Sequence, residues 1–160
     1  MFRKTLVSML IVGLAAMLVA CTRGSVAPPA AMVGHWEGKA EVAVNWCNAT
    51  ELIVSLTING DGTVTGKVGD AGLKDGHIYP NPGKPPKGFT LQTNFVVEAD
   101  LDGPLVAAEG ITRDTICIPV EVNKNGQLGG AFLTSGNEYG GKDEKVFSAG
   151  LKPLTRTPAP

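Results

Sequence analysis

The sequence predicts an all-β fold: a single small antiparallel β-barrel of about eight strands in meander order, with a two-sheet β-sandwich as the alternative. Three observations predict it. Beyond Val33, apolar and polar residues alternate with a period of two over most of the chain, as in half-buried strands. Clusters of Gly, Asn, Asp and Pro interrupt the alternation about every ten to twelve residues, a spacing typical of small all-β domains. A meander can close on itself, which leaves no exposed sheet edge.

The first predicted strand separates small or apolar residues from charged ones. Its even-numbered positions carry Trp36, Gly38, Ala40, Val42 and Val44, and its odd-numbered positions carry Glu37, Lys39 and Glu41. Alternate residues of a strand point to opposite faces, so the even-numbered set is expected to face the core. Gly38 and Ala40 are too small to fill a barrel interior, which would leave room for a guest molecule.

A hairpin is predicted next. Leu52, Val54, Leu56 and Ile58 alternate with polar residues, Ile53 excepted, as far as the turn Asn59-Gly60-Asp61-Gly62. Asn, Asp and Gly tolerate the positive φ angles that tight hairpin turns need. The alternation resumes over 63–68, with Val64 and Val68 expected inside.

Further strands are predicted at 73–79, 89–98, 105–112, 115–122, 127–134 and 145–151. The segments 105–112 and 115–122 are expected to form a hairpin, and Asn123 to Gly126 forms another tight turn. Pro119 has no N–H to donate, so 115–122 is expected to be an edge strand or to carry a bulge there. The proline-rich segment 80–88 is an expected exposed loop.

The N-terminus has the three zones of a secretory signal. Arg3 and Lys4 are positive, and the 15 residues from Leu6 to Ala20 are uncharged and almost entirely apolar. This run is shorter than the roughly 20 residues of a membrane-spanning helix and matches the apolar core of a cleaved signal. It ends in Leu18-Val19-Ala20-Cys21, which resembles the lipobox of bacterial lipoproteins.

The lipobox resemblance implies cleavage before Cys21 and fatty acylation, such as palmitate, of the new N-terminal cysteine. Each buried CH₂ of an acyl chain contributes about 0.8 kcal/mol, so two or three chains hold a protein on a membrane. Thr22 stands where an Asp would favour inner-membrane retention in Gram-negative sorting. By that rule the destination is the outer membrane, facing the periplasm. An ordinary signal peptide with a chance cysteine is the alternative.

The chain therefore divides into a signal peptide (1–20), a lipidated cysteine with a flexible tether (21–32), a barrel domain (33–154) and a disordered tail (155–160). The tether is small, proline-containing and without apolar period. Beyond the signal, 12 Lys and Arg stand against 15 Asp and Glu, and no basic cluster appears. Binding of nucleic acid is therefore not expected.

Cys47 and Cys117 remain once Cys21 is acylated. Exported compartments are oxidising, and an even pair of cysteines in a small exported domain favours a disulfide. Two buried free thiols are the alternative. Neither cysteine has a C-x-x-C partner or a histidine at the spacing of metal ligands.

Gly34-His35-Trp36, at the start of the first strand, resembles the Gly-x-Trp opening of lipocalin-like and avidin-like barrels. In those families the tryptophan closes one end of the barrel, often beneath a basic residue from near the last strand. The resemblance implies that Gly34 and Trp36 pack at the barrel base and that Lys152 or Arg156 supplies the basic group. Trp36 as ordinary core filling is the alternative.

No enzyme, metal or cofactor is predicted. His35 shares the outward-facing, odd-numbered positions of the first strand with the charged residues. Neither His35 nor His77 has a neighbour at the spacing of metal ligands, so both are expected on the surface. No nucleophile elbow or phosphate-binding loop occurs. The acidic residues that could supply a hydrolytic pair are expected in solvated turns: Asp100, Asp102, Asp143 and Glu144.

Two functions remain open, besides a structural role in the envelope. The first is a binding module for a small, partly apolar ligand inside the barrel. The second is a protein-interaction or inhibitor role for the loops, since Ser135-Gly-x-x-Tyr139 is similar to a short inhibitory-loop pattern of lysozyme inhibitors. Aromatic residues at strand ends are common contact residues, which makes Trp46, Tyr79 and Tyr139 candidates; packing of Trp46 over the disulfide is the alternative.

Overall fold

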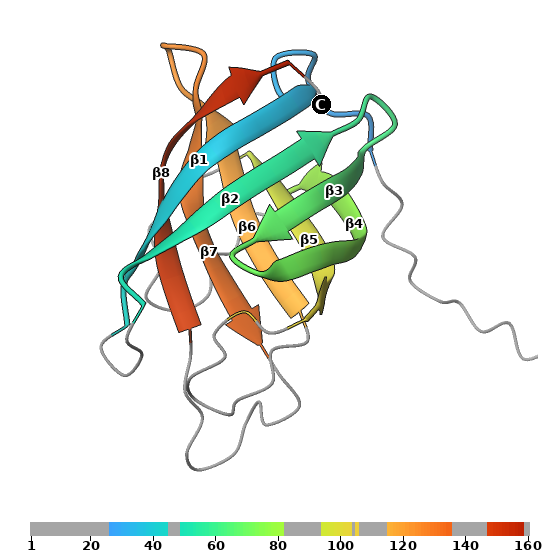
Figure 1. Ribbon diagram of the computed structural model, residues 1–160. Coiled ribbons are helices and arrows are strands. Elements are labelled where there is room, and N and C mark those ends of the chain that lie inside the picture. The colour runs from blue at the N-terminus through green and yellow to red at the C-terminus, as the bar shows by residue number, and fades with distance from the viewer. Residues whose placement is uncertain are drawn as a thin grey trace, which may run out of the picture.

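The computed structural model shows a closed barrel of eight antiparallel strands that pair in sequence order (Figure 1). It describes residues 26–44, 49–81, 94–103, 105, 115–135 and 147–158, with the backbone alone for 131–135 and 147. The predicted meander barrel is confirmed, and the sandwich alternative is wrong. Within the described part of the chain, no helix is long and apolar enough to cross a membrane.

The eight strands have the following bounds: β1 (Gly34–Val42), β2 (Glu51–Ile58), β3 (Thr63–Val68), β4 (Ala71–Pro80), β5 (Phe95–Asp102), β6 (Thr115–Val122), β7 (Leu128–Ser135) and β8 (Phe147–Thr157).

The barrel closes because β1 pairs with both β2 and β8. Gly34 lies opposite Ile58 of β2, and His35 lies opposite Thr157 of β8. We call the end that holds the start of β1 and the end of β8 the base; the β2–β3 and β6–β7 turns, the end of β4 and the start of β5 also lie there (top of Figure 1). We call the opposite end, which holds the β3–β4 turn, the mouth.

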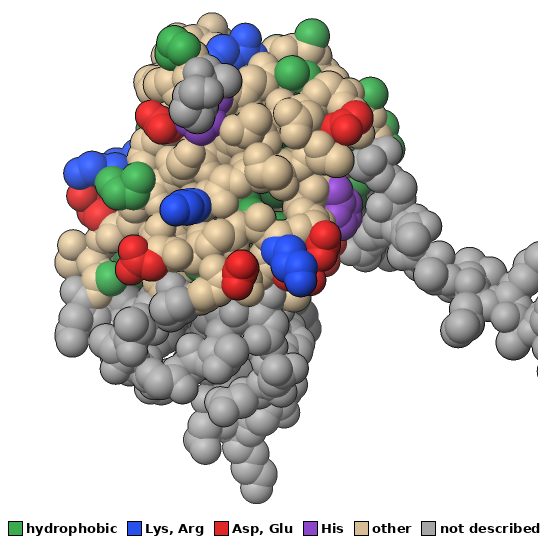
Figure 2. All heavy atoms as spheres, turned by 45° about the vertical axis from the view of Figure 1, so that its right-hand side comes forward, with side chains coloured by type: hydrophobic (Ala, Val, Ile, Leu, Met, Phe, Trp, Pro, Cys, Tyr) green, Lys and Arg blue, Asp and Glu red, His purple; other side chains and the backbone are tan. Residues whose placement is uncertain are grey.

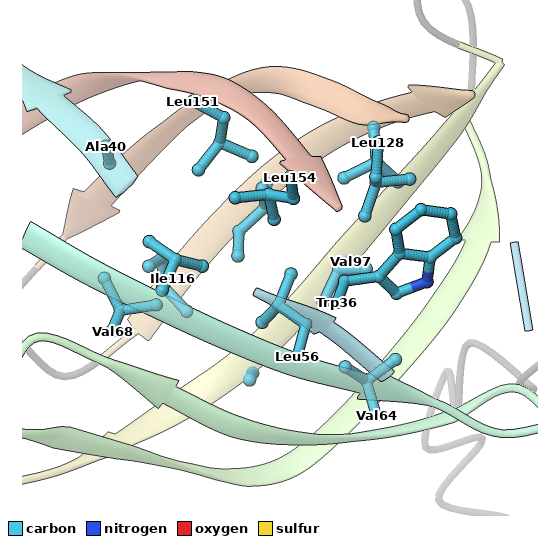
Figure 3. Close-up of a cluster of buried hydrophobic side chains, with 14 of the residues drawn as sticks. Trp36, Ala40, Leu56, Val64, Val68, Val97, Ile116, Leu128, Leu151 and Leu154 are labelled. Atoms are coloured by element: carbon cyan, nitrogen blue, oxygen red, sulfur yellow. The ribbon is translucent and has the colours of Figure 1, made fainter. Parts of the chain in front are cut away.

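The predicted inward faces are confirmed over β1, β2 and β3. Trp36 and Ala40 of β1, and Val54, Leu56 and Ile58 of β2, are buried in one hydrophobic cluster. Ile53, the exception in the sequence pattern, is 61% exposed on the outer face. The large side chain of Trp36 lies at the base end of this cluster, and Ala40 lies toward the mouth (Figure 3).

Both predicted tight turns at the base form. Gly62 N–H donates to the Asn59 carbonyl at 3.0 Å, and Gly126 N–H donates to the Asn123 carbonyl at 2.9 Å. Gly62 and Gly126 have φ angles of 86° and 73°, which residues with a Cβ rarely adopt. The turn residues therefore set the register of β2 with β3 and of β6 with β7.

The predicted hairpin between 105–112 and 115–122 is wrong. β6 pairs with β5 on one side and with β7 on the other, so no side of it is left for residues 105–112. Leu105 is instead buried against the core. The expected start of the preceding strand at Phe89 lies outside the described residues.

Pro119 lies neither at an edge nor at a bulge, contrary to expectation. It pairs with Val96 of β5, and the register of β6 with β7 is the same on both sides of it. The ladder to β7 passes from Cys117 opposite Leu133 to Val120 opposite Gly130. A proline removes one donor from a ladder, and here its neighbours keep the register.

Two strands extend beyond their predicted ends. β5 continues to Asp102, so Asp100 and Asp102 lie in a strand and not in a turn. β8 continues through Pro153 to Thr157, so residues 155–157 belong to the barrel and not to a disordered tail. Leu151 and Leu154, three positions apart, are both buried, because the register of β1 with β8 shifts at this point. This irregularity breaks the alternation by which the sequence identifies a strand.

We predict that Gly130→Ala destabilises the barrel strongly. A Cβ at Gly130 would lie 2.0 Å from the Pro119 carbonyl oxygen, and the φ angle of 153° disfavours any side chain. Overpacking and backbone strain together should lower the free energy of unfolding by about 2–4 kcal/mol, measured by urea denaturation with tryptophan fluorescence. The neighbour Gly129 has open space at its Cβ position, so Gly129→Ala is the matched control. Equal urea midpoints for the two variants would contradict the prediction.

Candidate functional site

Trp36 closes the base of the barrel from within. Its side chain is fully buried, and its indole Nε1–H donates to the Met32 carbonyl oxygen at 2.8 Å. Leu56, Val64 and Leu128 lie near it inside the barrel (Figure 3). A buried indole N–H needs an acceptor, and the chain just before β1 supplies it.

Arg156 covers Trp36 from the outer side of the base. Its guanidinium carbon lies 4.9 Å from the centroid of the Trp36 ring, within the range of a cation–π contact. Its Nη2 donates to the Ala31 carbonyl oxygen at 2.7 Å. Arg156 therefore joins the last strand, the tryptophan and the N-terminal segment.

Gly34 is glycine because Arg156 lies against it. A Cβ at Gly34 would be 3.2 Å from Nε of Arg156, and Gly34 has a φ angle of 139°. The Gly-x-Trp spacing thus makes room for the arginine and places the indole beneath it. The expected base packing of Gly34 and Trp36 is found.

Of the two basic residues expected over Trp36, the structure places Arg156 there and Lys152 elsewhere. The Lys152 ammonium is 2.7 Å from Glu51 Oε1, and Lys39 is 2.9 Å from Glu51 Oε2. Glu51 thereby bridges β1 and β8 on the outer face beside its own strand. The hydrogen bonds from Lys152 and then Lys39 lower the pKa of Glu51 to about 2, and the Glu51 bond raises the pKa of Lys152.

The last part of the expected tether is packed on the barrel. Met32 is 5% exposed within the core cluster, Pro28 is buried, and Val26 N–H donates to the Ile78 carbonyl at 3.3 Å. The domain boundary at 33 is therefore too late. We call residues 26–33 the strap. Its proline- and alanine-rich composition gives no sign of this packing, because most of its contacts are made through backbone atoms. The apolar pair Met32-Val33 directly before the Gly-x-Trp was the signal that the sequence offered.

The space expected beside Gly38 is filled. A Cβ at Gly38 would lie 2.6 Å from Cδ2 of Leu154, and Leu154 is fully buried. The register shift of β8 turns Leu154 inward and over Gly38. The glycine therefore admits a neighbouring side chain and leaves no room for a guest at this level.

Small side chains line the inward face nearer the mouth. Ala40 pairs with Leu151, Ala149 pairs with Val42, and Ala99 pairs with Ile116. Ala71 starts β4 directly after the mouth turn, and all four alanines belong to the buried core. The largest buried side chain, Trp36, thus lies at the base, and the described interior nearer the mouth mixes these alanines with larger side chains such as Leu151 and Ile116.

His35 points outward as expected, yet it is only 8% exposed, so its prediction as a surface histidine is wrong. Its Nδ1 lies 2.8 Å from Thr57 Oγ1, and its Nε2 lies 3.1 Å from Glu37 Oε1 and 3.5 Å from Ser55 Oγ. Both ring nitrogens are thus engaged on the outer wall between β1 and β2. The position of a residue in the alternation predicts which face of the strand it lies on. It does not predict whether neighbouring side chains cover that residue.

The two histidines do not come together, because His35 lies on β1 opposite Thr57 and His77 lies on β4 opposite Thr63. His77 is half-buried on β4; its Nδ1 lies 3.3 Å from the Asp75 carbonyl oxygen, and its ring lies 5.6 Å from that of Tyr79. Within the described residues, no group of three or more His, Cys, Asp or Glu could hold a metal ion.

The predicted contact residues do not form one site in the part of the chain that the structure describes. Tyr79 lies near the base end of β4, half-buried, and its hydroxyl donates to Glu98 Oε2 at 2.8 Å. Ser135 ends β7 at the mouth, where its backbone pairs with Thr115. Trp46 and Tyr139 lie outside the described residues.

Two of the cysteine predictions rest on residues that are not described. Cys21 and Cys47 lie outside the described ranges, so lipidation and the disulfide stay predictions. Cys117 is half-buried and lies opposite Glu98 and Leu133 on the outer face of β6, as its phase predicted.

No family model matches the chain, and no curated protein or solved structure matches it.

We predict that Arg156→Ala lowers the free energy of unfolding by about 1–2 kcal/mol. It removes a cation–π contact at a partly exposed site and a charged hydrogen bond to Ala31. Lys152→Ala removes an equally basic side chain of the same strand that makes only an exposed ion pair, so it should cost less than about 1 kcal/mol. Urea denaturation at neutral pH measures both values, and a larger loss for Lys152→Ala would contradict the assignment.

Proposed function

We propose that the chain is a membrane-anchored lipoprotein whose barrel is a binding module. The signal-like residues 1–20 and the Leu-x-Ala-Cys motif ending at Cys21 support the anchor. Thr22 supports sorting to the outer membrane, with the barrel in the periplasm. The barrel acts by binding and not by catalysis, and it needs no cofactor.

We propose further kinship with lipocalin-like and avidin-like barrels. The support is the base: Trp36 is buried beneath Arg156, and Gly34 makes room for the arginine. The strand count and the sequential pairing agree with such a barrel.

The function that the geometry supports best is the binding of a protein partner through the mouth. One observation carries it: the base half of the interior is filled, with Leu154 occupying the space beside Gly38. A packed barrel is a rigid scaffold, and rigid scaffolds commonly present binding residues on loops. The segment Ser135 to Tyr139 begins where β7 ends at the mouth, which supports an inhibitor of lysozyme or of a protease as the partner-binding role.

A small, partly apolar ligand is the second candidate. The four alanines that face inward toward the mouth support it, because small side chains in a barrel leave more room than leucine or phenylalanine. Native mass spectrometry of protein purified from its host would show a mass adduct that is lost on denaturation. Protein that is always free of such an adduct would count against this candidate.

We predict that the protein incorporates an alkyne analogue of palmitate and that Cys21→Ser abolishes this incorporation. The variant should be recovered in the soluble fraction, because its only acylation site is gone. In-gel fluorescence after labelling and separation of membranes measures both properties. Cys117→Ser is the matched control and should keep the label. Wild-type protein without label, together with Cys21→Ser that still sediments with membranes, would contradict the anchor.

We predict that the protein inhibits a lysozyme and that Ser135→Ala and Tyr139→Ala weaken the inhibition at least tenfold. Truncating one of the few residues that dominate a protein interface costs about 2 kcal/mol or more, which corresponds to about thirtyfold in affinity. Asp61→Ala, at the exposed base turn, should leave the inhibition unchanged. The absence of inhibition by the wild type would remove lysozyme as the partner, and equal losses in all three variants would remove the mouth as the binding surface.

A further inference from the structure

We propose that the barrel stands on the membrane with its base against the lipid headgroups and its mouth directed away from them. The proposal rests on the proposed lipidation of Cys21. The partner of the base is the surface of the membrane that holds the acyl chains of the same molecule.

The described part of the chain begins at the base. Val26 N–H donates to the Ile78 carbonyl at 3.3 Å, and Ile78 N–H donates to the Gly62 carbonyl at 2.8 Å in the β2–β3 turn. From there the strap runs across the base to Met32, which is held by the indole of Trp36 and buried in the core. The guanidinium of Arg156 holds Ala31. These contacts join Val26 to the rigid barrel.

Only five Cα-to-Cα steps separate Cys21 from Val26. A fully extended chain spans at most about 3.6 Å per residue, so Val26 lies within roughly 18 Å of the acylated cysteine. The tether of residues 21–32 expected from the sequence would have reached about 40 Å. The packing of the strap thus more than halves the reach of the anchor.

The reach is shorter than the barrel is tall. β1 has nine residues, which rise about 30 Å along the strand and about 20–25 Å along the axis of a barrel with strands tilted by 35–45°. With the mouth on the membrane, Val26 would stand about a barrel height above it and beyond the fully extended tether. With the base on the membrane, the tether needs no extension.

The charges on the side wall do not favour a barrel that lies on its side on the membrane. On the face of β2, β3 and β4, acidic and basic side chains are interspersed (Figure 2). The described charges of β3, β4 and the neighbouring β5 include Lys67 and Lys74 beside Asp75, Asp100 and Asp102. Attraction of a protein to anionic lipid needs clustered Lys and Arg, and this face mixes the two signs.

Three exposed residues can report the orientation. Lys124 lies in the β6–β7 turn at the base, Asp70 lies in the β3–β4 turn at the mouth, and Ile53 lies on the outer wall of β2. Each is replaced in turn by the photo-crosslinking residue p-benzoylphenylalanine in the lipidated full-length protein. The proteins are reconstituted in vesicles of phosphatidylethanolamine and phosphatidylglycerol, and lipid adducts are quantified by mass spectrometry.

We expect the Lys124 position to form at least five times more lipid adduct than the Asp70 position, with Ile53 in between. Equal adducts at Lys124 and Asp70, or the largest adduct at Ile53, would overturn the proposal. Co-flotation with the vesicles is measured first on the same samples, so a failure of lipidation is distinguished from a failure of orientation.

Lengthening the tether tests whether its short reach is what orients the barrel. Ten Gly and Ser residues inserted after Thr22 extend the reach by about 36 Å, enough for any face to touch the membrane. The difference between Lys124 and Asp70 should then fall to less than twofold. If the lengthened protein kept the full difference, the short tether would not orient the barrel, and the proposal in this form would be overturned.

Discussion

The structure depends on the burial of one tryptophan at the end of the barrel. Trp36 is the largest side chain in the core, and its indole N–H must find an acceptor once water is excluded. The strap before β1 supplies this acceptor at Met32, and Arg156 closes over the ring from the last strand. A single buried group thereby joins the first strand, the last strand and the N-terminal segment, which are the three parts that a barrel must bring together to close.

The closed base has consequences for function. A base filled by Trp36, Leu154 and their neighbours makes the barrel a rigid body, which is why the function we propose assigns recognition to the mouth. The same closure fixes the strap, and the fixed strap shortens the link to Cys21. Packing that stabilises the fold therefore also places the proposed binding end opposite the proposed lipid anchor.

The outer wall of the barrel around β1 is polar, and its polar side chains are paired with one another. Glu51 of β2 joins Lys39 of β1 and Lys152 of β8 toward the mouth, and His35, nearer the base on β1, is engaged at both ring nitrogens. Exposed ion pairs contribute little to stability. The hydrophobic interior supplies most of the driving force for closure of the barrel.

The sequence by itself determined the class of fold, the inward face of each early strand and the two tight turns at the base. These are local properties, because alternation and turn chemistry are set by residues close together in the chain. Only the tertiary structure decided that Leu154 fills the space beside Gly38, that Arg156 and not Lys152 covers Trp36, that Met32 is core and that His35 is covered. Each of these depends on a side chain or strand far away in sequence, and the register shift in β8 that brings Leu154 and Arg156 into place breaks the very periodicity by which a strand is recognised.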